Sequence, residues 1–172
     1  MLALGLALTG LLLIAGPDSS DWEAPNSKAR EFTLKDLDGN VLRSSDLRGK
    51  VVVLDFWATW CGPCIREVPE LIAFHESLKG RKDIAFLSLN VTDERADVAA
   101  FAREHKTPYP SYPADELIGP YELLAFPTKL VIDMRGELPG VVRFRKTGYT
   151  SRASLEDRVK AVVGAVAPRT AP

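Results

Sequence analysis

The chain has 172 residues, of which 46% are hydrophobic and 26% charged, and its formal net charge is −1. This length fits one domain with a sizeable core, and the balanced charge argues against nucleic acid as a partner and against an acidic disordered tail. The chain contains two cysteines, Cys61 and Cys64. Two cysteines are too few for a disulfide-stapled miniprotein or a four-cysteine zinc site, so they must act as a pair.

Residues 1–16 are almost wholly apolar, and Asp18 is the first charged residue. The segment is shorter than the roughly 20 apolar residues of a membrane span, but it suits the apolar region of a secretory signal peptide. A signal peptide, an N-terminal membrane anchor and a buried helix of the domain all remain open. The first two would place the domain outside the cytoplasm, in the bacterial periplasm or at the outer face of the inner membrane, with this segment as its one membrane contact. That is the location we expect.

The rest of the chain divides by composition. Residues 17–28 are rich in Asp, Ser, Pro and Asn and predict a polar linker. Residues 29–167 carry strand and helix patterns and predict the folded domain, and residues 168–172 form a short C-terminal tail.

Strand and helix patterns alternate through the predicted domain. Arg30–Leu34 and Val41–Arg43 flank the turn signal Asp38-Gly39-Asn40 and predict a β-hairpin. The apolar run Lys50–Trp57 is typical of a strand buried on both faces. The order of the elements predicts an α/β domain with a mixed central sheet. The further elements are a helix over Cys61–Lys79, strand Ile84–Val91, a helix over Asp93–His105, a short helix around Tyr121–Leu124, strands Lys129–Asp133 and Val141–Lys146, and a helix around Leu155–Val166.

The motif Trp60-Cys61-Gly62-Pro63-Cys64 places both cysteines at the predicted start of a helix. Residues three apart on a helix share a face, so the two sulfurs can meet in a disulfide. The N–H groups and partial positive charge of a helix N-terminus stabilise a thiolate, and proline is tolerated in the first turn. The pattern predicts a redox-active disulfide that needs no other cofactor, with Cys61 as the exposed nucleophile and Cys64 as the more buried resolving cysteine.

Three other uses of the cysteine pair fit less well. A c-type haem site needs a histidine after the second cysteine, where this chain has Ile65. A zinc site would need both His75 and His105, and His75 lies about three helical turns from Cys64, so we expect no bound metal. A purely structural disulfide across a four-residue loop would add little stability through loop closure.

The segment Val53–Cys64 resembles the thioredoxin superfamily at nearly every position, and Ala125–Asp133 resembles its second signature, a proline before a strand. Leu47–Lys50 and Ile65–Glu70 resemble the extracytoplasmic, often membrane-tethered branch of thiol-disulfide oxidoreductases similar to TlpA, ResA and CcmG. The resemblance implies a thioredoxin fold, in which helices flank a central mixed β-sheet, with an added N-terminal β-hairpin and a central insertion over Thr92–Tyr121.

The resemblance also implies a docking surface for a client protein. Pro127 matches the family's cis-proline, which would leave the backbone of Phe126 open to pair with an extended client and bring the client's cysteine to Cys61. Trp60 lies next to Cys61 in the sequence. The client-binding residues that we expect are Trp60, Gly62, Pro63, Phe126, Pro127 and Thr128.

Two acidic residues are candidates for handling the proton of Cys64. Asp55 stands six residues before Cys61, where thioredoxins hold a buried aspartate, and burial of a carboxyl group disfavours its charged form. Glu67 stands three residues after Cys64, where reductases resembling ResA hold a glutamate near the active site, although a solvated helix residue fits the pattern equally well. We predict both as catalytic residues and leave open which of them accepts the proton.

Together these features predict a thiol-disulfide oxidoreductase that reduces disulfides in extracytoplasmic proteins. Its partners would be disulfide or dithiol proteins, apocytochrome c among the candidates, and an upstream electron donor. Two alternatives stay open. Peroxiredoxins carry a Thr-x-x-Cys element, whereas Thr59 is two residues before Cys61. Copper-binding domains similar to Sco proteins pair a Cys-x-x-x-Cys motif with a distant histidine, whereas the cysteine spacing here is one residue shorter. His105 lies on an apolar helix face, where a histidine is more often a packed core residue than a metal ligand.

Overall fold

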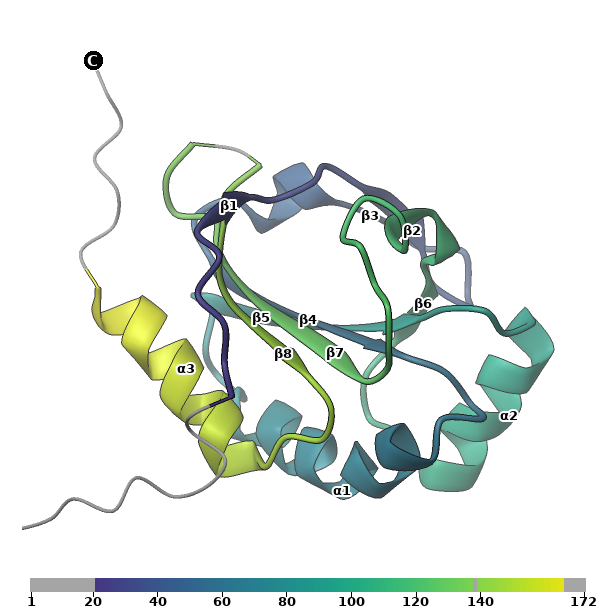
Figure 1. Cartoon of the computed structure of the whole chain (residues 1–172). Helices are drawn as coiled ribbons and strands as arrows, with labels where there is room; N and C mark the ends of the chain where they lie inside the picture. Colours follow the sequence, from purple (N-terminus) through teal and green to yellow (C-terminus); the bar gives the residue numbers. More distant parts are fainter. Residues whose placement is uncertain (1–20, 138, 166–172) are drawn as a thin grey trace, which may run out of the picture.

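The computed structural model describes residues 21–137 and 139–165. In this part of the chain, helices pack against a mixed six-stranded sheet, and a two-stranded hairpin forms a second sheet (Figure 1). The expected signal peptide or anchor at 1–16 and the expected tail at 168–172 lie outside the described residues. No helix in the described part is long and apolar enough to cross a membrane.

The central sheet has the strand order β1-β8-β7-β4-β5-β6. All seven residues of β4 are buried, in keeping with its continuous apolar run, and β4 pairs in parallel with β5 and antiparallel with β7. The mixed central sheet is therefore confirmed. Its strands are β1 (Ser27–Lys28), β4 (Val51–Trp57), β5 (Ile84–Asn90), β6 (Ser111–Pro113), β7 (Thr128–Asp133) and β8 (Val141–Thr147).

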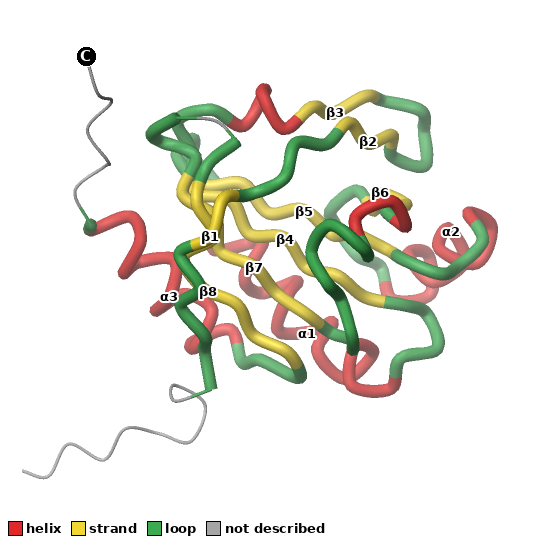
Figure 2. The backbone as a smooth tube through the Cα atoms, turned by 45° about the horizontal axis from the view of Figure 1, so that its top comes forward, coloured by secondary structure: helices red, strands yellow, loops and turns green. Residues whose placement is uncertain are grey.

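The two faces of the sheet have different covers, as the views in Figures 1 and 2 show. Helices α1 and α3 cover one face, and α2 lies beside the start of α1. The hairpin and the chain that leads into β7 cover the other face. These elements are α1 (Gly62–Ser77), α2 (Arg95–His105), α3 (Arg152–Gly164), the hairpin strands β2 (Thr33–Lys35) and β3 (Val41–Arg43), and the 3₁₀ helices η1 (Ser44–Leu47) and η2 (Asp115–Leu117).

Alternation along β4 divides the core into two layers. Val52, Leu54 and Phe56 belong to the apolar cluster beneath the hairpin and the insertion. Val51 and Val53 belong to the cluster beneath α1 and α3. The next positions of this second set are occupied by Asp55 and Trp57, so the helix-covered face carries the polar end of β4.

The described part of the expected linker is more than a connector. Ser27 and Lys28 form β1, which pairs with Val142 and Val141 at the edge of the sheet, and Trp22 Nε1 donates a hydrogen bond to Ser154 Oγ at 3.0 Å. Two strand residues are too few to show an alternating pattern, which is why the sequence did not predict this strand.

The short helix expected around Tyr121–Leu124 was a wrong prediction. The expected insertion, Thr92–Tyr121, folds as α2, β6 and η2, and the chain then turns at Tyr121 and Glu122. Glu122 has a φ of 49°, which is left-handed and ends any helix at that point. Leu124 after it is 95% exposed, so this segment presents an apolar side chain to solvent.

Candidate active site

Cys61 and Cys64 form a disulfide at the N-terminus of α1. Cys61 is the N-cap residue of the helix, and its Sγ accepts a hydrogen bond from the backbone N–H of Cys64 at 3.3 Å. Pro63 stands in the first helical turn, where a missing N–H removes no helical hydrogen bond. The local sequence thus places Cys61 where a helix N-terminus can stabilise its thiolate once the disulfide is reduced.

Both cysteines are buried in this oxidised form. Cys61 is 5% exposed and Cys64 is 3% exposed, so the prediction of an exposed first cysteine and a buried second one is not met. The reason is the surrounding apolar cluster, to which the distant helix α2 contributes Val98 and Phe101. Trp60, by contrast, is 65% exposed.

The loop before β7 lies beside the disulfide. The Phe126–Pro127 peptide bond is cis, as the resemblance implied, and Phe126 packs against the cluster around both cysteines and lies 6.2 Å from the Trp60 ring, centroid to centroid. No hydrogen bond within the described residues uses the backbone N–H or C=O of Phe126. Those two groups are therefore available to a partner chain.

The other expected docking residues differ in accessibility. Gly62 is exposed and Pro63 is half-buried, but Pro127 and Thr128 are buried. Thr128 Oγ1 donates to the carbonyl of Ala125 at 2.7 Å and lies 3.3 Å from Thr147 Oγ1. The Thr128 side chain therefore supports the loop from within, in place of the surface contact expected from the sequence.

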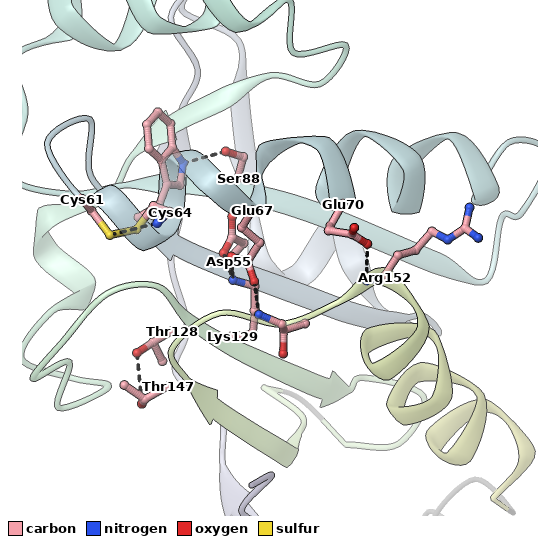
Figure 3. Close-up of polar contacts among 12 residues, drawn as sticks. Asp55, Cys61, Cys64, Glu67, Glu70, Ser88, Thr128, Lys129, Thr147 and Arg152 are labelled. Atoms are coloured by element: carbon pink, nitrogen blue, oxygen red, sulfur yellow. Dashed lines mark hydrogen bonds and ion pairs between the residues drawn. A yellow bond between two sulfur atoms is a disulfide. The ribbon is translucent and has the colours of Figure 1, made fainter. Parts of the chain in front are cut away.

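A cluster of three charged side chains lies beside the disulfide, between α1 and the sheet (Figure 3). Asp55 on β4 stands directly opposite Lys129 on β7 in the antiparallel register, and Lys129 Nζ forms an ion pair with Asp55 Oδ1 at 3.0 Å. Lys129 Nζ also donates to Glu67 Oε2 from α1. The exposure of Asp55, Glu67 and Lys129 is 1%, 0% and 0%, so this cluster is closed off from bulk water.

The second oxygen of Glu67 is bound to the loop between β8 and α3. The Thr150 N–H donates to Glu67 Oε1 at 2.5 Å. One turn further along α1, Glu70 Oε2 accepts the N–H of Arg152 at 2.8 Å, at the start of α3 (Figure 3). Glu67 is therefore an interior residue, and the alternative of a solvated helix residue is wrong.

Burial sets the protonation of this cluster. Burial, together with the charge of Asp55, raises the pKa of Glu67 to about 7 although Lys129 acts in the opposite direction. Burial lowers the pKa of Lys129, but the charges of Asp55 and Glu67 outweigh that effect and raise it overall. The lysine therefore stays charged at neutral pH, while Glu67 exchanges its proton near neutrality.

A small cavity connects the charged cluster with the resolving cysteine. Its volume is about 10 Å³, counted as the space open to the centre of a water molecule, and Cys64, Asp55 and Glu67 all line it, with Ser88 and Tyr109. That space is about the size needed for one water. Cys64 and the two buried carboxyl groups therefore face the same small space.

Sequence reasoning missed Lys129 as a site residue. It was included only as a member of a buried strand, although a lysine in such a strand is rarely fully buried unless it is paired. The combination of Asp55 in one buried strand and Lys129 in another was the available signal, and the strand register joins them.

The contacts also bear on the alternative activities. Thr59 Oγ1 donates to Asp93 Oδ1 at 2.7 Å, and the Thr59 N–H binds the other oxygen of that carboxylate. His105 packs its ring against Phe101 with the centroids 4.1 Å apart. Neither of these contacts involves Cys61 or Cys64.

Comparison with known proteins agrees with the geometry of the site. The sequence matches the model of the AhpC/TSA family over residues 25–140. A thiol-disulfide oxidoreductase ResA from Geobacillus kaustophilus is 32% identical over 141 residues, which cover 81% of this chain and 78% of the relative. The protein of the same name from Bacillus subtilis is 29% identical over 133 residues, or 76% of this chain and 72% of the relative.

A solved structure shows the same architecture. The thiol:disulfide interchange protein of the thioredoxin family from Chlorobium tepidum superposes with a TM-score of 0.70 at 27% identity, over 83% of this chain and 99% of that one. The predicted thioredoxin fold and the predicted thiol-disulfide chemistry are both confirmed by these relatives.

Proposed function

Because this chain belongs to the AhpC/TSA family and is a thiol-disulfide oxidoreductase, we propose that it works as a reductant of disulfides in extracytoplasmic client proteins. The Cys61–Cys64 pair carries the electrons, and an upstream dithiol donor restores it after each turnover. The environment of the two sulfur atoms is the observation that supports this direction of electron transfer.

We infer that these surroundings stabilise the disulfide more than the thiolate, because burial and nearby negative charge oppose the effect of the helix N-terminus. The helix N-terminus and the Cys64 N–H favour a thiolate at Cys61. Burial among apolar side chains and the two carboxylates beneath Cys64 act against a thiolate. A strong oxidant owes its potential to a stabilised reduced form, so this balance favours donation of electrons to clients.

The reaction proceeds in two exchanges. The Cys61 thiolate attacks one sulfur of the client disulfide, a mixed disulfide forms, and the other client sulfur leaves as a thiolate, which takes a proton from solvent. Cys64 then gives its proton to the Asp55–Glu67 pair and attacks Cys61 Sγ. The Cys61–Cys64 disulfide forms, and the client leaves with two reduced cysteines.

The client is held by its backbone in this proposal. The free N–H and C=O of Phe126 would pair with an extended client segment, and the exposed Trp60 would contact its side chains. Backbone hydrogen bonds do not depend on the amino-acid sequence of the client. Several extracytoplasmic proteins, apocytochrome c among them, are therefore candidate clients.

The location rests on residues 1–16, whose apolar composition fits a secretory signal or an N-terminal anchor. Expression of the full chain in a bacterium, followed by protease treatment of spheroplasts, tests it. We expect the domain to be degraded without cell lysis, and full protection would contradict an extracytoplasmic domain.

A redox titration tests the direction of transfer. Equilibration of the purified protein with a thioredoxin-type dithiol pair should give a midpoint potential near that of thioredoxin, about −270 mV. A potential near that of DsbA, about −120 mV, would make the protein an oxidant.

Trapping tests the client and the roles of the two cysteines. Cys64→Ala should arrest the mixed disulfide on Cys61, and the adducts from an extracytoplasmic fraction would identify the clients by mass. Cys61→Ala is the matched control and should trap none. Equal trapping by both variants would contradict the assignment of Cys61 as the nucleophile.

A further inference from the structure

We propose that Lys129 is a positioning residue of the redox reaction, the fixed positive charge that lets Asp55 and Glu67 exchange a single proton beneath Cys64. The inference rests on the proposed role of the acid pair as acceptor of the Cys64 proton. It adds a third member to the site, one to which neither the motif nor the resemblance assigns a role.

The contacts of Lys129 are unusual for a lysine. Its side chain is fully buried, with an exposure of 0%, and lysine is almost never buried without a partner. Its Nζ lies between two carboxyl groups that come from different elements, Asp55 on β4 and Glu67 on α1. Lys129 is therefore the contact that joins the two acids into one unit.

The position of Lys129 is fixed by the sheet. In the register of the sheet, Ser88 on β5, Asp55 on β4, Lys129 on β7 and Lys146 on β8 are consecutive neighbours in one row. Trp57 Nε1 donates to Ser88 Oγ at 2.7 Å beside this row (Figure 3). Strand pairing and α1 packing thus hold the lysine against the two acids that line the cavity together with Cys64.

The charge count explains why a lysine is needed there. With Lys129 protonated and both acids ionised, the cluster carries a net charge of −1, and uptake of the Cys64 proton makes it neutral. Without the lysine, the same two acids would have to change between −2 and −1 in a buried site. Two buried carboxylates close together do not both stay ionised, so one acid would already hold a proton near neutral pH.

Other titratable groups face this cluster. Tyr109 lines the cavity, and burial, together with the nearby charges of Asp55 and Glu67, raises the pKa of its hydroxyl. Lys146 occupies the neighbouring position on β8, and its Nζ lies 3.4 Å from Asp21 at the sheet edge. Cys64 faces the cluster from α1. Of the two lysines, Lys129 is the one whose Nζ contacts both acids.

The test is a direct titration of Glu67 in the oxidised protein, by the ¹³C shift of its carboxyl carbon, assigned with Glu67→Gln. Lys129→Met should move the titration of Glu67 upward by about 1 pH unit or more, because loss of an adjacent opposite charge has effects of that size. Lys129→Arg keeps the charge and should restore most of the shift. Lys146→Met is the matched control and should move the titration less than Lys129→Met does.

A second variant, with an expected shift of the Glu67 titration in the opposite direction, keeps the test valid if Lys129→Met does not fold. Asp55→Asn removes the negative neighbour and leaves Lys129 with Glu67 alone, so the titration of Glu67 should move downward. Unchanged titration in Asp55→Asn, or in a folded Lys129→Met, would overturn the proposed coupling.

The kinetic readout separates this inference from the proposed function. The rate at which Cys64 resolves a preformed mixed disulfide on Cys61 should follow the same pH shifts as the carboxyl titration. A titration that moves while the resolution rate does not would retain Lys129 as the counter-charge and reject the acid pair as the proton acceptor. No shift in either would reject the role of Lys129 itself.

Discussion

On one face of β4 and β7 the buried residues are apolar apart from Thr128, whereas on the other face the same two strands bury charged side chains at both ends. Leu54 and Leu130 are neighbours on the first face, and Asp55 and Lys129 are neighbours on the second. The hairpin covers the first face and α1 covers the second. The buried charges of these two strands therefore all lie on the helix-covered face of the sheet.

The charged ends of the helix-covered face differ from each other as well. At the end of β7 away from the disulfide, Asp133 binds the partly exposed Arg135, which also donates to carbonyl groups at the end of α3. At the end near the disulfide, Lys129 has its two acids within a closed interior. The first pair stabilises the packing of α3, and the second cluster shares a cavity with a reactive cysteine.

The largest effect on stability is expected from removing one member of the buried cluster. Lys129→Met leaves two buried acids without their counter-charge and should lower the free energy of unfolding by about 3–5 kcal/mol, measured by urea denaturation of the oxidised protein. Replacement of all three together, with Asp55→Leu, Glu67→Met and Lys129→Met, should be neutral or stabilising by up to about 4 kcal/mol. If the Lys129→Met variant is as stable as the parent, the two buried acids do not need the lysine as their counter-charge, and the prediction is wrong.

A truncation on the apolar face should be costly in a different way. Leu54→Ala removes a fully buried side chain and should lower the free energy of unfolding by about 2–5 kcal/mol. The loss comes from a cavity and not from a charge, so it should be the same at pH 5 and pH 8. A loss that grows or shrinks between these pH values would mean that the two faces are coupled.

The charged face should make the free energy of unfolding depend on pH, whereas the apolar face should not. The pKa of Glu67 is about 7 in the folded chain against an ordinary value of 4.5, so the folded state binds the proton more tightly. The protonated Glu67 side chain therefore adds to the free energy of unfolding. This stabilisation is fully present below pH 4.5 and is lost as the pH rises through 7, which lowers the free energy of unfolding by about 3 kcal/mol.

Urea denaturation at pH 5, 6, 7 and 8 measures this fall, and Glu67→Gln is the control. The variant has no proton to lose, so its stability should be nearly constant over this window. A parent chain whose stability rises between pH 5 and pH 8 would contradict the assigned direction.

The smallest effect on stability is expected outside both faces. Trp60 is exposed, so Trp60→Ala should change the free energy of unfolding by no more than about 0.5 kcal/mol. Its loss should instead raise the KM for reduction of a protein disulfide such as that of insulin, with little change in kcat. An unchanged KM would remove Trp60 from the proposed docking surface.

Much of this architecture could be predicted from sequence because its signals are local. The apolar run of β4 and the cysteine motif at a helix start each lie within a few consecutive residues. The burial of Glu67 could also be predicted. It lies on the same helical face as Cys64, Val68 and Leu71, and that spacing indicates burial. The periodicity of α1 was therefore the available signal for the burial of Glu67.

The remaining features depend on contacts between distant segments. The pairing of Asp55 with Lys129 follows from the register of two strands that an insertion separates, and no local pattern encodes a register across such a distance. The burial of Cys61 depends on α2 and on Phe126, which the motif around the cysteines does not contain. Long-range packing therefore decided the protonation and accessibility of a site whose chemistry was visible in five residues.

The edges of the central sheet have a consequence for how selectively this domain meets other chains. An open strand edge can recruit any extended segment and start aggregation. Here the short strand β1 covers β8 at one edge, and the three-residue β6 at the other edge ends in Pro113, which has no N–H to offer. Both edges therefore offer an extended segment few free backbone groups at these positions. In the proposed mode of client binding, such a segment would pair at the Phe126 loop, beside the cluster that contains Cys61.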